Sequence, residues 1–154
     1  MKYLIPDENG ILNTKKYFDY IHSIKEKVPK SVYDFASNDD HYNLLSHDSL
    51  HDAWLNFFEI REDASGARSE NRKAIVNIEL LAPFHDKKIH LKYKIVRRVS
   101  IEQKECNVAD GHGDLLIHEF RLGEESSIIH EIVFDHGGTY LIEFEDFEFN
   151  YEDI

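Results

Sequence analysis

Histidine and aspartate are the side chains in this sequence whose types and spacing could support chemistry. Residues 44–55 contain the dipeptide His-Asp twice, four positions apart. If this segment is helical, His47 and His51 project from one face, and two imidazoles at that spacing can hold a transition metal that takes further ligands. The candidate metal ligands are His47, His51, Asp52 and His85, with His41 and Asp86 as alternatives.

A structural role for these residues is favoured over metal binding or catalysis. No glutamate lies between the two histidines as it does in a metalloprotease helix, and no further ligand follows at a fixed spacing. His and Asp side chains also cap helices and hydrogen-bond loop amides at the start of a strand. No cofactor is expected, since the sequence has no Gly-rich phosphate loop, no nucleophile elbow and no Cys/His ligand set.

Two further histidines are predicted to lie inside a β-sheet. Residues 114–122 and 127–135 alternate apolar and polar side chains, which is the pattern of strands with one buried face. His118 and His130 fall on the apolar face, and a three-residue loop at 123–125 would place them opposite each other in an antiparallel hairpin. A histidine in such a position is more often a hydrogen-bonded core group than a general base.

A third strand is predicted after the Gly-Gly turn at 137–138, with the even-numbered apolar residues from Tyr140 to Phe144 on one face. After Phe144 the apolar residues move to odd positions, beginning with Phe147. This change of phase by one residue predicts a β-bulge near 145–146 or the end of the strand there.

Negative charge is concentrated in the same C-terminal segment. Residues 111–154 contain one Lys or Arg and twelve Asp or Glu, and the whole chain has a formal net charge of −12. Such a surface repels nucleic acid and anionic membranes and favours a cationic protein partner, although an acidic face that is merely solvated is the alternative. The predicted partner-binding residues are Glu119, Glu131 and Glu143, opposite the histidines, with Glu124 and Glu125 at the hairpin tip.

The predicted fold is α+β, in a single domain over residues 1–154. Residues 1–49 are expected to be mainly helical and residues 50–154 mainly β. Because helices precede strands instead of alternating with them, we expect one antiparallel, meander-like sheet of about six strands with the helices packed on one face.

The first helix is predicted from an apolar stripe between Tyr17 and Val28, and the proline that follows ends it. Trp54, at the start of the first long strand, is expected in the core against this helix. A later strand carries Lys92 and Lys94 on its outer face, where they are positioned to pair with acidic residues of the C-terminal strands across the ladder.

Length and cysteine content favour a reducing, cytoplasmic location. A chain of 154 residues can bury a stable core without disulfides, and the single Cys106 cannot pair within the chain. No apolar N-terminal segment of a signal peptide and no run of about 18 apolar residues is present, so no membrane association is expected. The oligomeric state stays open.

Five short motifs along the second part of the chain can be compared with known proteins. They are Leu-His-Asp-Ala-Trp-Leu at 50–55, Leu-Ala-Pro-Phe-His-Asp at 81–86, Ile-His-Leu at 89–91, Leu-Ile-His-Glu at 116–119 and Ile-His-Glu at 129–131. Together they resemble a group of small bacterial proteins of uncharacterised function, with relatives among the immunity proteins of toxin systems. The resemblance covers about residues 50–149 and implies a sheet-rich, cytosolic, non-enzymatic partner-binding protein. It implies no catalytic residues.

Two functions therefore remain open. The first is a non-enzymatic acidic binding protein, an immunity or antitoxin-like inhibitor that neutralises a cationic toxin by protein–protein contact. The second is a metal-binding module or metal-dependent enzyme that uses the His-Asp cluster at 47–52 and 85–86. Salt-sensitive capture of a basic partner would test the first, and the metal content of protein purified without a His tag would test the second.

Overall fold

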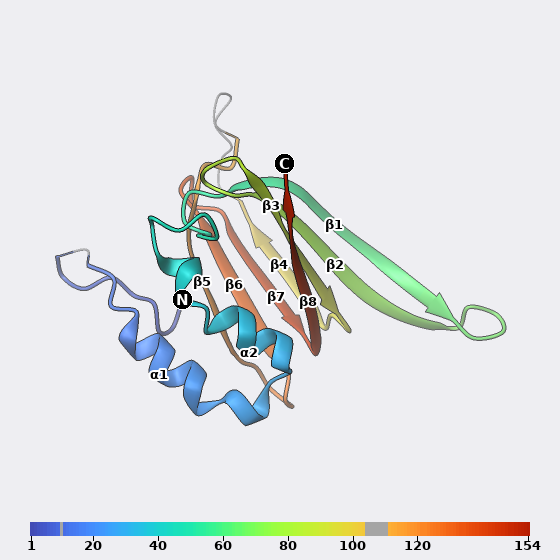
Figure 1. Ribbon diagram of the computed structural model, residues 1–154. Coiled ribbons are helices and arrows are strands. Elements are labelled where there is room, and N and C mark those ends of the chain that lie inside the picture. Colours follow the sequence, from blue (N-terminus) through green and yellow to red (C-terminus); the bar gives the residue numbers. More distant parts are fainter. Residues whose placement is uncertain (10, 104–110) are drawn as a thin grey trace.

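The computed structural model describes residues 1–9, 11–103 and 111–154 (Figure 1). The helices are α1 (Lys15–Ser23) and α2 (Lys30–Ala36), each followed by a short 3-10 helix, η1 (Lys25–Lys27) and η2 (Asp39–Tyr42). The strands are β1 (Trp54–Ser65), β2 (Asn71–Leu81), β3 (Lys87–Lys94), β4 (Arg98–Glu102), β5 (Leu115–Leu122), β6 (Ile128–Phe134), β7 (Thr139–Phe144) and β8 (Asp146–Asp153). Cys106 lies outside the described residues. No helix in the described part of the chain is long and apolar enough to span a membrane.

The α+β prediction is confirmed, but the single sheet of about six strands is wrong. The described strands form two four-stranded antiparallel sheets, in the orders β1-β2-β3-β8 and β4-β7-β6-β5. The chain passes between the sheets twice at one corner, from β3 to β4 and from β7 to β8. There Arg97 N–H donates to the Glu143 carbonyl and Glu145 N–H donates to the Lys94 carbonyl. Strands that continue from one sheet into the other are difficult to separate by periodicity alone.

The change of phase after Phe144 marks this corner. β7 ends at Phe144 and β8 begins at Asp146, so the predicted strand end is confirmed. Tyr140, Ile142 and Phe144 are buried from the second sheet and Phe147 is buried from the first. The one-residue shift therefore lets both halves of the ribbon face the same core.

The β5–β6 hairpin forms with both histidines on its buried face, as predicted, but its register differs. His118 pairs with Ile132, and His130 pairs with Phe120. The reason is that the connecting loop comprises residues 123–127 and is two residues longer than the predicted one. Because side chains alternate with a period of two, this shift leaves both imidazoles on the same face.

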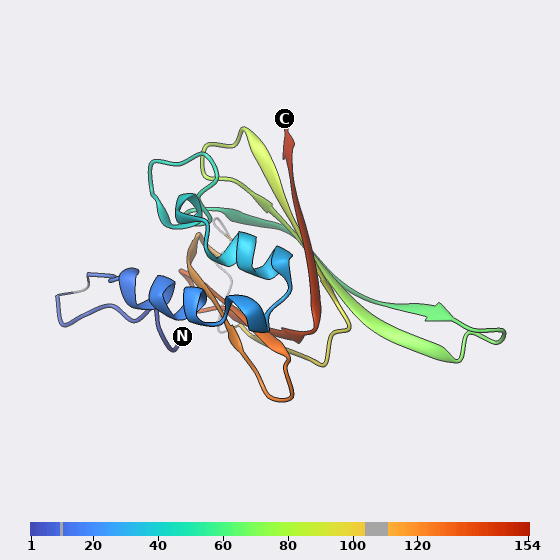
Figure 2. The same ribbon diagram turned by 60° about the horizontal axis from the view of Figure 1, so that its bottom comes forward.

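Helices α1 and α2 lie on the side of the body opposite the projecting β1–β2 hairpin (Figure 2). The Tyr17 hydroxyl accepts a hydrogen bond from Phe120 N–H at 2.9 Å, and the Tyr20 hydroxyl accepts one from Leu122 N–H at 2.9 Å. Open strand edges present N–H groups that can pair with another chain, so α1 protects the edge of β5. Helix α2 packs against β8 and β5 around the buried Phe35.

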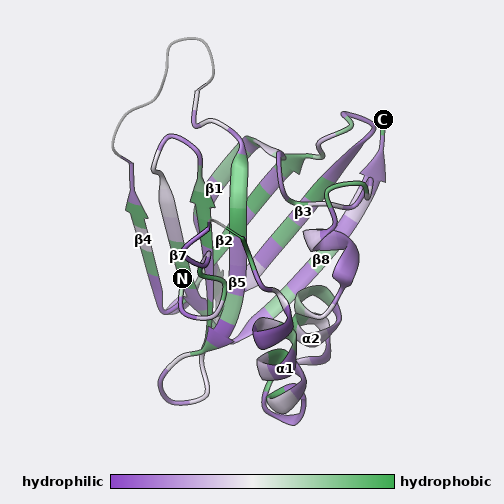
Figure 3. Cartoon of the chain, turned by 90° about the vertical axis from the view of Figure 1, so that its left-hand side faces the viewer, coloured by the Kyte–Doolittle hydropathy of each residue, from purple (hydrophilic) through white to green (hydrophobic). Residues whose placement is uncertain are grey.

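Figure 3 shows apolar and polar residues that alternate along the strands in bands. The buried apolar residues of the helices and of both sheets form a common core. The β1–β2 hairpin departs from this arrangement because it projects beyond the body (Figure 1). From Ile60 to Ser65 in β1 and from Asn71 to Lys73 in β2 every residue is exposed. The end of the hairpin therefore packs against nothing in the described chain.

The outer face of the first sheet carries an ionic ladder between β3 and β8. We use this name for the side chains Lys88, His90, Lys92 and Lys94 of β3 and Asp146, Glu148 and Glu152 of β8. Lys94 contacts both Glu148 and Asp146, and Lys92 lies 3.4 Å from Glu148. The predicted pairing of the basic strand with the acidic C-terminal segment is confirmed.

Candidate functional site

Two buried histidines and a tyrosine form a hydrogen-bonded chain through the core. His118 Nδ1 lies 3.1 Å from His130 Nε2, and His130 Nδ1 lies 2.7 Å from the Tyr93 hydroxyl. All three side chains are buried. His118 Nε2, also buried, has no hydrogen-bond partner among the described residues. The chain thus runs from β3 through β6 to β5 and ends at an unpaired imidazole nitrogen.

Burial controls the protonation of this chain. Removal from water disfavours the charged imidazole and lowers the pKa of His118 and His130 well below the ordinary histidine value, with a further lowering of the His118 pKa by the neighbouring histidines. Burial also raises the pKa of Tyr93 well above its ordinary value. All three groups are therefore neutral near pH 7.

A third buried histidine, His41 in η2, is a structural group rather than a metal ligand. Its Nδ1–H donates to the Phe35 carbonyl at 2.8 Å, which leaves Nε2 to accept from the Tyr151 hydroxyl at 2.5 Å. Burial lowers the pKa of His41 to about 4. Both nitrogens are occupied, so the use of His41 as an alternative metal ligand is not supported. Its polar sequence surroundings gave no sign that it would be buried.

A pocket of about 690 Å³ opens beside His118, between the N-terminal segment, η2 and β5. The Tyr42 ring stacks on the His118 imidazole with 4.7 Å between ring centroids and forms part of the wall. The remaining wall is mainly apolar, with Leu4, Leu12, Leu44, Leu115 and Leu116 among its residues. No sequence pattern predicted this pocket, because its wall combines residues from four separate parts of the chain, the N-terminal segment, residues 41–51, β5 and β6.

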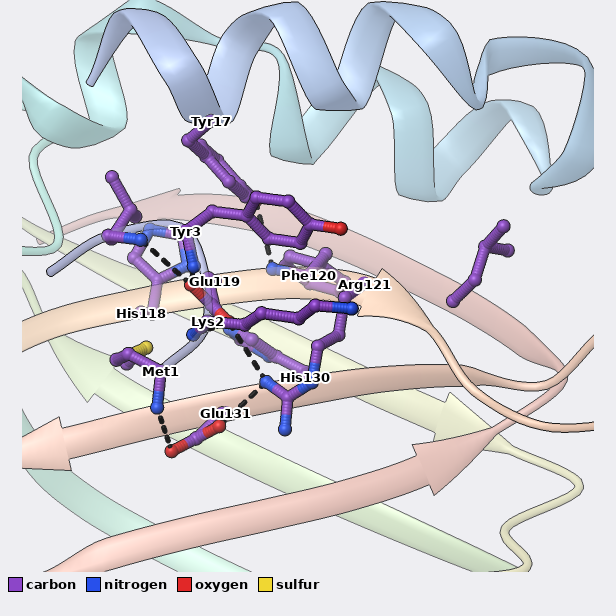
Figure 4. Close-up of polar contacts among 12 residues, drawn as sticks. Met1, Lys2, Tyr3, Tyr17, His118, Glu119, Phe120, Arg121, His130 and Glu131 are labelled. Carbon is purple, nitrogen blue, oxygen red and sulfur yellow. Dashed lines mark hydrogen bonds and ion pairs between the residues drawn. The ribbon is translucent and has the colours of Figure 1, made fainter. Parts of the chain in front are cut away.

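Glu119, predicted to lie on an exposed partner-binding surface, is buried (Figure 4). Its carboxylate accepts hydrogen bonds from the backbone N–H groups of Lys2, Tyr3 and Leu4 at 2.6, 2.9 and 3.0 Å. Arg121 Nη1 donates to the same carboxylate at 3.0 Å. Strand alternation does place Glu119 opposite the histidines, but the N-terminal segment covers that face. The expected exposure is therefore wrong for this residue.

Glu131 and Glu143 are also engaged inside the molecule. Glu131 is 12% exposed and contacts Arg121 at 2.6 Å and the N-terminal amino group at 2.5 Å. Burial raises the pKa of Glu131, but hydrogen bonds from the amino group and Arg121 outweigh it, so the pKa lies below the ordinary value. Glu143 is 15% exposed, accepts from Ser127 Oγ at 2.6 Å and lies 3.3 Å from Arg98. Neither carboxylate is presented freely to a partner.

Glu124 and Glu125 at the β5–β6 tip are exposed. Glu125 forms an ion pair with Arg97 at 3.1 Å. Of the five predicted partner-binding residues, these two are the ones that the structure leaves on the surface. Their role in binding stays a prediction.

The doubled His-Asp segment does not form the helix that would align His47 with His51. Instead His47 Nδ1–H donates to Asp86 Oδ2 at 2.5 Å, and His51 Nδ1 lies 2.8 Å from Asp52 Oδ1. His85 packs its ring against Trp54. No group of three or more His, Cys, Asp or Glu in the described residues could hold a metal ion. The candidate metal ligands are therefore separated into pairs.

Trp54, predicted to be in the core, is 48% exposed. A shift of the β1–β2 register between Leu55 and Phe57 explains the difference, because it turns Trp54 and Phe57 to the same outer face. The indole Nε1–H donates to Asp114 Oδ1 at 2.7 Å. Simple alternation could not predict this arrangement, since a single inserted residue reverses the face.

Exposed aromatic rings and exposed or half-buried carboxylates therefore gather where β1 begins and the β2–β3 turn passes it. We call this surface the aromatic–acidic patch, and it consists of Trp54, Phe57, Phe84, Asp52, Asp86 and Asp114. Phe84 stacks on His47, which in turn bonds Asp86 and lowers the pKa of that carboxyl. Within the described ranges, none of the patch carboxylates has an ion pair with lysine or arginine. The patch therefore offers aromatic faces beside negative charge.

Comparisons with protein-family models, with curated proteins and with solved structures found no match to this chain. The geometry of its own residues is consequently the basis for a functional proposal.

Proposed function

We propose that this protein is a non-catalytic, cytosolic binding protein that docks a cationic protein on the aromatic–acidic patch, in the manner of an immunity or antitoxin-like inhibitor. The observation that carries the proposal is the exposed indole of Trp54, held by Asp114 at the surface. Exposed tryptophan and phenylalanine side chains are typical anchors of protein interfaces. The carboxylates around them select a partner of positive charge.

The chemistry of the patch suits arginine and lysine side chains of a partner. A cation placed over an aromatic face gains about 0.5–2 kcal/mol, and a carboxylate beside the ring can pair with the same cation. Most acidic residues of the C-terminal strands already pair within the chain, as the ionic ladder shows. The formal net charge of −12 adds long-range attraction that brings the partner to the surface.

The position of β1 also suits partner binding. β1 is an edge strand of its sheet, and the hairpin that it forms with β2 extends beyond the body (Figure 1). Ile60 on this projection is exposed. A partner seated on the patch could therefore contact the projecting hairpin as well, which would enlarge the buried interface.

Trp54 fluorescence tests the proposal directly, because Trp54 is the only tryptophan in the chain. The probe is the purified product of the gene adjacent to the one that encodes this chain. We expect binding to shift the Trp54 emission to shorter wavelength as the indole leaves water. Affinity should fall by about tenfold or more between about 50 and 500 mM NaCl, because salt screens the attraction between exposed charges.

Matched substitutions locate the surface. Trp54→Ala and Asp86→Asn should each weaken binding by about tenfold or more, as expected for an interface anchor and its charge partner. The control is Glu124→Gln with Glu125→Gln at the β5–β6 tip, which should leave affinity within about twofold. Absence of binding by this partner would contradict the proposal. If only the Glu124→Gln, Glu125→Gln variant lost binding, the assignment of the interface to the aromatic–acidic patch would be wrong, and the β5–β6 tip would be the interface.

A further inference from the structure

The pocket beside His118 contains a polar atom that the rest of the chain does not satisfy. His118 is buried and its Nε2 has no partner among the described residues. His118 also forms part of the pocket wall. A buried polar atom without a hydrogen bond is costly and rare in native proteins, so its position beside a pocket calls for a ligand.

The hydrogen-bonded chain determines which role this nitrogen has. If the Tyr93 hydroxyl donates to His130 Nδ1, then His130 Nε2–H donates to His118 Nδ1, and the remaining proton is on His118 Nε2. This polarity leaves one atom without a partner, the Nε2–H group. The opposite polarity leaves two, the Tyr93 proton and the His118 Nε2 lone pair. The first polarity is therefore favoured, and His118 presents a donor.

We propose that the pocket binds an uncharged, mainly apolar molecule whose single oxygen acceptor takes a hydrogen bond from His118 Nε2–H. The volume of about 690 Å³ lies within the range of about 300–1,000 Å³ that small-molecule sites occupy. The stacked Tyr42 ring and the leucine side chains supply the apolar wall. Ketones, alcohols and esters with a hydrocarbon chain or ring belong to this ligand class.

The charges around the pocket exclude an anionic ligand. The pocket wall includes no lysine or arginine from the described residues, and the N-terminal amino group of Met1 is engaged with Glu131. The buried carboxylate of Glu119 follows His118 directly in β5. A carboxylate or phosphate would therefore meet no lysine or arginine of the described wall, whereas a neutral carbonyl or hydroxyl oxygen needs only the imidazole donor.

A pair of probes on the wild-type protein tests the proposal without any substitution. Decan-2-one and undecane have the same number of heavy atoms and differ in the oxygen acceptor. After correction for the transfer of each probe from water into hydrocarbon, we expect the ketone to bind about tenfold more tightly in calorimetric titration, which is the effect of one additional buried hydrogen bond. Binding should also move the imidazole ¹⁵N signals of His118 in NMR spectra. Equal corrected affinities, unmoved signals, or no binding of either probe would each overturn the proposal.

Two sets of variants separate the donor from the pocket. His118→Phe keeps a ring but removes the donor, so the affinity for the ketone should fall by about tenfold while that for the alkane stays within about twofold. Leu44→Trp narrows the pocket and should reduce the affinity for both probes, whereas Leu45→Trp, at the exposed neighbouring position outside the wall, should reduce neither. A His118→Phe protein that keeps the preference for the ketone would contradict the assigned donor. Equal effects of the two tryptophan substitutions would contradict the assigned pocket.

Discussion

The buried carboxylates of the second sheet and the ionic ladder of the first sheet contain the same kinds of side chains in opposite environments. Glu119 is fully buried, and its carboxylate accepts hydrogen bonds from three backbone N–H groups and from one guanidinium group. In the ladder, Glu148 is exposed and faces Lys92 and Lys94 in water. A strongly acidic segment thus contains two kinds of carboxylates. Some are buried and stabilise the fold, and others are exposed and mainly remain hydrated.

The difference follows from desolvation. An exposed ion pair contributes little to stability, because the hydration that it replaces is almost as favourable. A buried carboxylate is costly to remove, because its removal leaves its hydrogen-bond donors and its cationic partner buried without a partner. Net charge counted along a sequence does not distinguish these cases. The −12 of this chain is therefore a guide to long-range attraction and not to which carboxylates touch a partner.

The largest expected effect is at Glu119. Glu119→Gln keeps the size of the side chain but turns one acceptor oxygen into a donor that faces backbone N–H groups. We expect the free energy of unfolding to fall by about 3 kcal/mol, with faster amide exchange at Lys2, Tyr3 and Leu4 in the native state. Urea denaturation and hydrogen exchange measure the two quantities. A urea denaturation midpoint equal to that of the wild type would show that the buried carboxylate of the second sheet contributes no more to stability than the exposed carboxylates of the ladder.

The buried histidines predict a steep loss of stability in mild acid. Their ordinary pKa is 6.5, and in the folded state burial lowers the pKa of His41 to about 4 and lowers those of His118 and His130 well below the ordinary value. The unfolded chain therefore binds protons below about pH 6.5 that the folded chain does not, so stability is complete above that pH and falls below it. Each histidine contributes about 1.4 kcal/mol per pH unit in this window.

Urea midpoints between pH 7 and pH 5 measure this slope, in a range above the ordinary carboxyl pKa values of about 4. His118→Phe should reduce the slope by about 1.4 kcal/mol per pH unit, because one titrating group is lost. A stability that stays constant across this range would show that the imidazoles are already protonated or accessible to water.

Two tyrosines of α1 sharpen the comparison within one helix. Tyr17→Phe leaves the buried N–H of Phe120 without an acceptor and should cost about 1–3 kcal/mol. Tyr20→Phe affects the N–H of Leu122, which is only partly buried, and should cost less than about 1 kcal/mol because water can replace the hydroxyl. Thermal or urea denaturation of both variants tests the order. A larger loss for Tyr20→Phe would contradict the role of burial.

The local pattern of the sequence was sufficient for the strands and their faces. Alternation with a period of two is a property of neighbouring residues, so it correctly predicted that His118 and His130 are buried and that the ribbon changes phase after Phe144. The helices were predictable for the same reason, since an apolar stripe and a proline lie within a few turns of each other.

Contacts between distant segments were not predictable from that pattern. Glu119 is covered by residues 2–4, which are more than a hundred positions away, and no periodicity reports such docking. At Trp54 a single irregularity in register reversed the face, and in the β5–β6 loop two more residues than expected shifted the pairing. The pocket beside His118 depends on four separate parts of the chain at once, so nothing in the sequence indicated it.

The smallest expected effect is in the ladder itself, at Glu148. Glu148→Gln removes the charge that faces Lys92 and Lys94, but Lys94 keeps Asp146 at 3.3 Å and both ammonium groups remain hydrated. We expect the free energy of unfolding to change by less than about 1 kcal/mol, and the difference from the wild type to shrink as salt is added. Urea midpoints at low and high NaCl measure both. A loss as large as that of Glu119→Gln would mean that the ladder supports the first sheet as the buried carboxylates support the second, and the contrast drawn from desolvation would fail.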